Sequence, residues 1–142
     1  MKKKYVTVVA LVGILILSLT ACGGGNSASD DPLDGTSWEL MAYRKTRPIS
    51  GTTITATFED GKVSGSAGCN SYSGSYQVYG DNRIAIGPTA ITEMACMEPE
   101  GVMEQEMTFI EFLTGAQTFQ LTDEQLQLFR ADGEALTFVL QN

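Results

Sequence analysis

The chain contains no histidine, and this absence excludes more chemistry than any other feature of its composition. Histidine is the usual general base near neutral pH and the commonest metal ligand in proteins. Serine and cysteine mechanisms that rely on an imidazole are therefore excluded. The 142 residues include only three cysteines, and nine basic residues face seventeen acidic ones. Such a chain is a poor partner for nucleic acid.

Three of the basic residues stand at the start of the chain, just before its one long apolar run. Residues 2–4 are all lysine, and the run from Val6 to Leu19 is almost wholly apolar. This run is shorter than the roughly 20 residues of a transmembrane helix and is followed by glycines rather than by a basic flank. The pattern predicts a secretion signal over residues 1–21 that is removed.

The last residues of this signal, Leu19-Thr20-Ala21-Cys22, resemble the bacterial lipobox. That resemblance implies a diacylglycerol thioether on Cys22, cleavage before it, and N-acylation afterwards, for example with palmitate. The alternative is an ordinary secretion signal followed by a cysteine that is not acylated. Two or three acyl chains anchor a protein durably, because each buried methylene contributes about 0.8 kcal/mol. We therefore expect a lipoprotein whose partner is the lipid bilayer.

Residues 22–32 comprise the acylated cysteine and a predicted flexible tether, because residues 23–31 include no apolar side chain large enough to pack. With the signal removed, six positive charges face seventeen negative ones, for a net charge of −11. Gly23 after the acylated cysteine favours the outer membrane, facing the periplasm, in a Gram-negative cell. In a Gram-positive cell the location would be the outer face of the plasma membrane. Residues 33–142 suffice for a single domain, which we expect to be monomeric.

Short runs rich in Thr, Val, Ile, Phe and Tyr alternate with turn residues at intervals of about ten residues, a pattern typical of antiparallel β structure. Asp60-Gly61, the stretch 79–82 and Asp132-Gly133 are the predicted hairpin turns. We expect seven or eight strands. They are centred on residues 38–42, 54–58, 62–68, 73–78, 83–86, 118–121, 126–129 and 136–140.

Residues 100–114 break the two-residue period, because their apolar residues recur at helical spacing. Gly115 is the predicted end of this helix. Its apolar arc is wide enough to predict a deeply packed helix, with Met103 and Met107 in the core. Glu106 also points into this arc, where an unpaired carboxylate is costly. We expect Glu106 to accept hydrogen bonds from backbone amides or from a tyrosine and so to fix the helix on the sheet.

Cys69 and Cys96 are the two cysteines that remain once Cys22 is acylated. An exported domain permits oxidation, so a disulfide is the favoured prediction, with two buried thiols as the alternative. A catalytic cysteine is disfavoured because no histidine is available to activate it.

The folded part resembles the META domain family, also called HslJ-like. The motifs that carry the resemblance cover nearly the whole domain: Gly35-Thr36-Ser37-Trp38, Gly65-Ser66-Ala67-Gly68-Cys69-Asn70-Ser71-Tyr72, Thr92-Glu93-Met94-Ala95-Cys96, the helix with Glu106, and Leu136-Thr137-Phe138. The resemblance implies antiparallel strands curled, barrel-like, around one helix, a mainly β single domain. It also implies links to heat stress and antibiotic resistance, with no enzymatic activity established.

Trp38, Gly68, Asn70 and Glu106 are the positions that this resemblance marks as family motif residues with a structural role. Asn70 opens a polar stretch that could bind a ligand, but a structural role is favoured because asparagine satisfies backbone groups in turns. The glutamates around residues 93–104 match no calcium loop, and methionines at helical spacing are usually core residues rather than copper ligands. We therefore predict neither a metal nor another cofactor.

Three functions follow as hypotheses. The first is a membrane-anchored, non-enzymatic envelope lipoprotein that binds an unknown envelope protein. The second is a carrier of an apolar small molecule in a pocket of the curled sheet, lined by Phe109, Phe119 and Phe129. The third and least favoured is a hydrolase that works through two carboxylates across a cleft.

Overall fold

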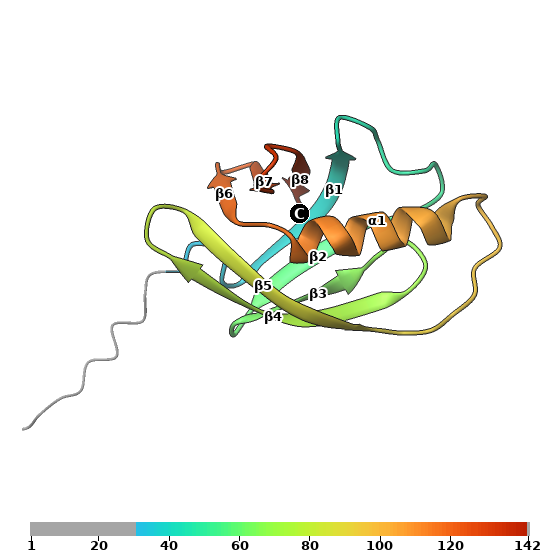
Figure 1. Ribbon diagram of the computed structural model, residues 1–142, viewed down its shortest axis with the longest axis horizontal. Helices are drawn as coiled ribbons and strands as arrows, with labels where there is room; N and C mark the ends of the chain where they lie inside the picture. The colour runs from blue at the N-terminus through green and yellow to red at the C-terminus, as the bar shows by residue number, and fades with distance from the viewer. Residues whose placement is uncertain (1–30, 142) are drawn as a thin grey trace, which may run out of the picture.

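A computed structural model of the protein describes residues 31–141, and Figure 1 shows their arrangement. The predicted signal over residues 1–21, the acylation site Cys22 and most of the tether lie outside the described residues. Eight strands and one helix follow one another along the described part of the chain. They are β1 (Thr36–Tyr43), β2 (Thr55–Glu59), β3 (Lys62–Ser66), β4 (Ser71–Tyr79), β5 (Arg83–Ile91), α1 (Val102–Thr114), β6 (Thr118–Leu121), β7 (Gln125–Phe129) and β8 (Ala135–Leu140).

The strands form one closed antiparallel barrel in which each strand pairs with the next and β8 returns to β1. The closing pair is extensive, running from Trp38 opposite Leu140 to Tyr43 opposite Leu136. The junction of β5 and β6 is the shortest, because α1 is inserted between these two strands and only Arg83 and Thr118 are paired there. The mainly β, barrel-like fold around one helix that the sequence predicts is confirmed.

The predicted hairpin turns lie where the sequence places them. At the β2–β3 turn, Asp60 and Gly61 both have positive φ, +49° and +72°. This backbone matches the right-handed twist of the flanking strands, and glycine and aspartate adopt it at low cost. Asp81 and Asn82 do the same between β4 and β5, with φ of +64° and +55°. Local turn chemistry therefore sets the register of both hairpins.

Large side chains fill the interior of the barrel. The alternate residues of the strands point inward, as the two-residue period requires, and their largest members are fully buried. Phe109 of α1 lies among them and meets the rings of Tyr72 and Phe138 edge-on, with centroids 5.5 and 6.5 Å apart. The fully buried side chains include Trp38, Phe58, Phe109, Phe112, Phe138, Leu113, Leu126, Leu128 and Leu136.

The helix α1 begins after Gly101 and ends before Gly115, as its spacing predicts, but its rotation about its own axis differs from the prediction. Gln105 and Glu106 are buried, whereas Met107 is 64% exposed. The prediction that Met107 lies in the core is therefore wrong. The reason is that a polar partner for Glu106 lies inside the barrel, so this face of the helix turns inward. No helix within residues 31–141 is long and apolar enough to cross a bilayer.

Tyr76 ties the entry of the described chain to the barrel. Its hydroxyl donates to Asp31 Oδ2 at 2.7 Å, and its ring meets that of Phe58 edge-on. Burial raises the pKa of Tyr76 well above its usual range, and the hydrogen bond to Asp31 and the charges of Asp31, Asp34 and Asp60 add to the rise. Burial also raises the pKa of Tyr72. Both hydroxyls must stay protonated in the folded barrel.

These two raised pKa values predict loss of stability in alkali. A tyrosine in the unfolded chain ionises near pH 10, whereas the folded chain holds Tyr72 and Tyr76 neutral to higher pH. Their contribution to the free energy of unfolding is therefore complete below about pH 10 and falls as the pH rises further. Tyr76→Phe should cost about 1 kcal/mol at pH 7, the net value of one hydrogen bond, and should make the alkaline decline shallower. Urea unfolding at several pH values measures both; an unchanged slope would contradict the assignment.

Candidate functional site

Glu106 is bound at both carboxylate oxygens by a single residue, Asn70. The backbone N–H of Asn70 donates to Oε2 at 2.7 Å, and its side-chain Nδ2 donates to Oε1 at 2.8 Å. Both residues are buried. Of the two expected kinds of donor, a backbone amide is present and a tyrosine is not; the second donor is the side-chain amide of Asn70. Tyr72, the nearby candidate, donates its hydroxyl to the carbonyl of Thr55 instead.

Asn70 also binds the segment that follows β5. Its Oδ1 accepts from the hydroxyl of Thr92 at 2.8 Å and from the backbone N–H of Met94 at 2.7 Å. Its Nδ2 donates a second bond, to the carbonyl of Met94, at 3.1 Å. Every donor and acceptor of this amide therefore has a partner, which is what a buried polar group requires. One side chain connects the β3–β4 corner, the segment after β5 and α1.

Gly68 stands two residues before Asn70 and allows the chain to turn there. Its φ of +112° lies in a region that other residues rarely adopt, and a Cβ would lie 3.2 Å from Nε2 of Gln105. The tight corner brings the backbone N–H of Asn70 to the helix, and Ala67 N–H donates to the carbonyl of Asn70 at 2.7 Å. The positions of Gly68 and Asn70 are structural in this geometry.

A disulfide joins Cys69 to Cys96, with the Cα atoms 6.1 Å apart. This separation is within the range that a disulfide spans. The bond joins residues that are 27 positions apart in sequence, for which the chain-entropy model gives a stabilisation of about 3–4 kcal/mol. Because Cys69 precedes Asn70, the covalent bond and the asparagine hold the same segment, residues 92–101, against the helix.

Gln105 is a buried polar residue that the sequence analysis missed. Its Oε1 accepts from the backbone N–H of Ile49 at 2.6 Å, and its Nε2 donates to the hydroxyl of Thr52 at 2.9 Å. It thereby fixes the long β1–β2 connection to α1. Its only signal in the sequence is its place beside Glu106, and a glutamine on a helix is usually exposed.

Trp38 lies apart from this polar cluster. It is buried and donates from Nε1 to the hydroxyl of Thr36 at 2.7 Å, and that hydroxyl donates to the carbonyl of Leu33. Trp38 borders a surface hollow together with Leu121 and Leu140. Of the predicted motif residues, the structure brings Gly68, Cys69, Asn70, Cys96 and Glu106 together, and it leaves Trp38 outside.

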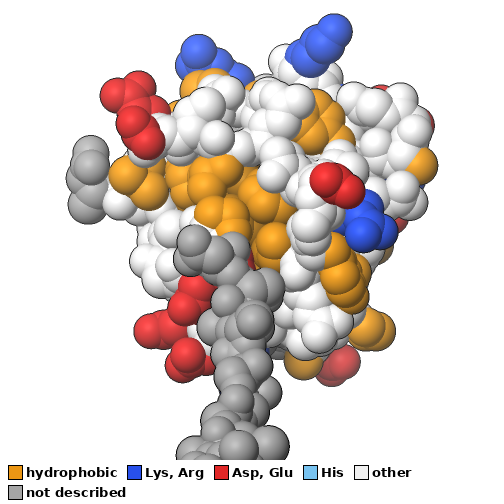
Figure 2. Space-filling view, turned by 90° about the vertical axis from the view of Figure 1, so that its left-hand side faces the viewer, with side chains coloured by type: hydrophobic (Ala, Val, Ile, Leu, Met, Phe, Trp, Pro, Cys, Tyr) orange, Lys and Arg blue, Asp and Glu red, His pale blue; other side chains and the backbone are white. Residues whose placement is uncertain are grey.

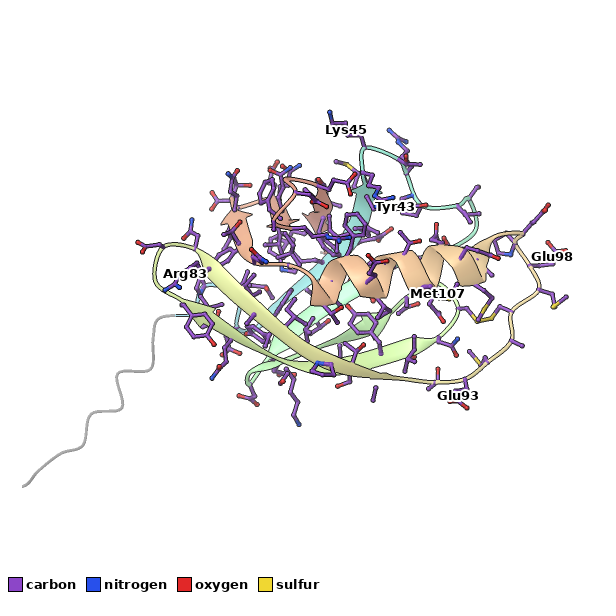
Figure 3. The ribbon with its side chains drawn as sticks, viewed as in Figure 1. Tyr43, Lys45, Arg83, Glu93, Glu98 and Met107 are labelled. Carbon is purple, nitrogen blue, oxygen red and sulfur yellow. A yellow bond between two sulfur atoms is a disulfide. The ribbon has the colours of Figure 1, made fainter. Side chains whose placement is uncertain are left out.

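An apolar surface, which we term the methionine face, borders the polar cluster. Ile91, Met107 and Ile110 line a surface hollow of about 360 Å³, beside Glu106 and Glu111. The segment after Ile91 carries Met94, whose backbone binds Asn70, and Met97, which is 85% exposed. The methionine face consists of Ile91, Met94, Met97, Met107 and Ile110. Figure 3 shows Met107 on α1, with Glu93 and Glu98 on the segment that the disulfide holds.

The acidic residues around this face are solvated. Glu93, Glu98, Glu104 and Glu111 are all exposed. Within residues 31–141, no group of three or more Cys, Asp or Glu side chains is placed to hold a metal ion. We refer to these four glutamates as the acidic rim: Glu111 borders the hollow, and Glu93 and Glu98 lie on the segment that carries Met94 and Met97.

The phenylalanines of the carrier hypothesis are separated in the structure. Phe109 is fully buried in the core, whereas Phe129 borders a surface hollow of about 530 Å³ at the Arg44–Lys45 turn. Two carboxylates also border this hollow, and each pairs with an arginine: Glu134 with Arg44 at 2.8 Å, and Asp132 with Arg130 at 3.8 Å. These carboxylates serve in ion pairs, and the barrel interior at Phe109 is filled.

The Asn70–Glu106 pair predicts that substitutions of Glu106 lower the free energy of unfolding markedly. Glu106→Gln should destabilise the fold by about 2 kcal/mol, because its NH₂ group would face one of the two donors of Asn70. Glu106→Ala should cost about 3 kcal/mol, because both donors lose their partner. Denaturant unfolding measures these values.

Glu104→Gln is the matched control on the exposed side of the helix, and its effect should stay within about 0.5 kcal/mol. In a double-mutant cycle, Asn70→Ala combined with Glu106→Ala should cost less than the sum of the two single changes, because both remove the same hydrogen bond. Strictly additive losses would show that the two residues act independently and would refute the pairing.

Comparison with known proteins supports one family. A family model described as the META domain matches residues 31–142. An NMR structure of a protein from Burkholderia xenovorans is 32% identical, with a TM-score of 0.65 over 78% of this chain and 84% of its own. Another NMR structure is 25% identical, with a TM-score of 0.61 over 76% of this chain and 91% of its own.

The crystal structure of a DUF4847 family protein from Bacteroides vulgatus shares the fold at 16% identity, with a TM-score of 0.55 over 78% of this chain and 95% of its own. No curated protein matches the chain. The family match spans all the described residues, including Gly68, Asn70, Glu106 and the disulfide. This chain therefore belongs to the META domain family.

Proposed function

We propose that this META domain protein is a lipid-anchored, non-enzymatic accessory protein of the cell envelope that binds another envelope protein through the methionine face. The observation that carries the proposal is the methionine face itself: four of its apolar side chains are exposed, and a disulfide and Asn70 attach the segment with Met94 and Met97 to the barrel. A surface that is built rigidly and left apolar is typical of an interaction site.

The chemistry of the methionine face favours a protein partner. Methionine side chains are flexible and polarizable, so they adapt to apolar surfaces of different shape. The acidic rim adds a preference for a partner that carries basic residues around an apolar centre, since complementary charges steer association. The net charge of −11 for the mature chain disfavours an anionic partner.

The anchor is supported by the sequence alone. A basic start, an apolar run and small residues precede Cys22, and eight small or polar residues separate it from Asp31. Acylation at this position would hold the folded domain close to one face of a bilayer. In this proposal the domain acts locally, on partners that share its membrane.

The anchor predicts a simple fractionation result. The wild-type protein, expressed in a bacterial host, should sediment with membranes, and its N-terminal peptide should carry acyl chains on Cys22 by mass spectrometry. Cys22→Ala should block processing, so that the product keeps its signal segment and carries no acyl chains. A wild-type product that begins elsewhere, or that has a free thiol at Cys22, would refute the anchor.

The partner surface predicts site-specific crosslinking. A photo-crosslinking amino acid at Met97 or Met107 should capture a discrete protein in intact cells, because both side chains are exposed on the methionine face. The same group at Met41, an exposed methionine on β1, is the matched control and should capture none. Equal capture from all three positions would contradict a specific surface. The absence of capture at Met97 and Met107 would count against the proposal.

A further inference from the structure

The end of the barrel where the described chain begins carries a second apolar surface. Its side chains come from the first described residues, from the β4–β5 hairpin, and from the ends of β6 and β8. We term it the entry face; it consists of Pro32, Val78, Tyr79, Leu121 and Leu140. Two hollows, of about 320 and 380 Å³, lie on it. Figure 2 looks onto this end and shows a broad apolar area there.

The entry face arises because two strands, β6 and β8, continue beyond the core and still place apolar side chains on their inward-facing side. Leu140 follows Phe138 by two residues and so points to the same side of β8, yet Phe138 is fully buried and Leu140 is 41% exposed. Leu121 stands in the same relation to Phe119 on β6. No element within residues 31–141 covers Leu140. The barrel thus has an apolar end that faces outward.

The place where the chain enters the barrel indicates that the bilayer covers this end. Pro32 belongs to the entry face, and the chain between Cys22 and Asp31 is short. Only eight residues separate the two, so an anchor at Cys22 would keep this end of the barrel near the bilayer. This step rests on the anchoring in the proposed function: if Cys22 is acylated, the entry face is the part of the domain nearest the lipid.

The polar groups around the entry face match a zwitterionic lipid surface. Tyr79 is 44% exposed, and an amphipathic ring of this kind favours the interface between headgroups and acyl chains. The guanidinium carbon of Arg83 lies 5.8 Å from the centroid of the Tyr79 ring, where its N–H groups can donate to a lipid phosphate. Asp81 and Asp123 border the two hollows and can face headgroup ammonium groups.

We infer that the entry face rests on the headgroup region of the bilayer, so that the anchored domain has one orientation. The methionine face and the disulfide-held segment then point away from the lipid. Figure 3 labels Arg83 at the entry end of the barrel and Glu98 at the opposite end. The orientation would place the partner-binding surface where an envelope protein can reach it.

Hydrogen exchange of the acylated full chain tests this orientation. The protein is bound to vesicles of phosphatidylethanolamine and phosphatidylcholine and is compared with the same acylated protein in detergent micelles. Backbone amides of residues 78–83 and 119–124 should exchange several-fold more slowly on the vesicles, whereas residues 92–101 should be unchanged. The double variant Tyr79→Ser, Leu140→Ser should lose this protection and still sediment with the vesicles. Met41→Ser is the control and should behave as the wild type.

The outcomes separate this inference from the anchoring. A protein that sediments with vesicles but shows equal exchange at both ends would overturn the orientation and leave the anchor intact. An unacylated Cys22 would overturn both. Protection that occurs only in native membranes, and not on pure lipid vesicles, would mean that a membrane protein covers the entry face, which also overturns the inference. The thermal unfolding midpoint and the exchange of residues 92–101 verify that the double variant is folded.

Discussion

The hydrogen-bonded pair of Asn70 and Glu106 is the interaction on which the arrangement of this domain depends. A buried carboxylate is tolerated only where its oxygens are satisfied, and both oxygens here are satisfied by one residue. That residue in turn holds Met94 and Thr92. The rotation of α1, the path of the segment after β5 and the corner at Gly68 are therefore coupled, and none can change without leaving a polar group unsatisfied in the core.

This coupling has a consequence for the surface. Because Glu106 faces inward, Met107 faces outward, next to Ile110 and beside Ile91 of β5. The disulfide from Cys69 to Cys96 fixes the neighbouring segment, which carries Met94 and Met97. The apolar surface thus combines a strand end, a helix face and a segment that the disulfide and Asn70 attach to the barrel. Binding to such a preorganised surface costs less conformational entropy than binding to a flexible one.

The two apolar surfaces of the barrel have different origins. The methionine face is produced by the side of a helix that the buried pair turns outward, whereas the entry face is produced by strands whose inward positions extend beyond the core. Their charges also differ: the acidic rim near the methionine face consists of glutamates, whereas the entry face has both signs, with Arg83 beside Tyr79 and with Asp81 and Asp123 at its hollows. In the proposed arrangement, one meets a protein and the other meets lipid. Membership of the META domain family identifies the fold, and the surfaces carry the functional argument.

The sequence by itself determined the elements whose physics is local. β-Prone runs between turn residues located the strands, although β5 extends past its predicted end to Ile91; the helical period and Gly115 located α1, and Asp60-Gly61 located a hairpin. The unusual place of Glu106 was also visible, because a carboxylate in an apolar arc demands a partner. The presence of two remaining cysteines, Cys69 and Cys96, in a domain predicted to be exported favoured the disulfide that the structure contains.

Only the tertiary structure decided which groups meet. Closure of β8 onto β1, the partner of Glu106, the burial of Gln105 and the exposure of Met107 all depend on contacts between residues far apart in the chain. Helical spacing gives the angle between side chains around α1 but not its rotation relative to the barrel. That rotation is set by the cost of burying the Glu106 carboxylate away from Asn70, which is 36 residues away in sequence and is brought into contact by the fold.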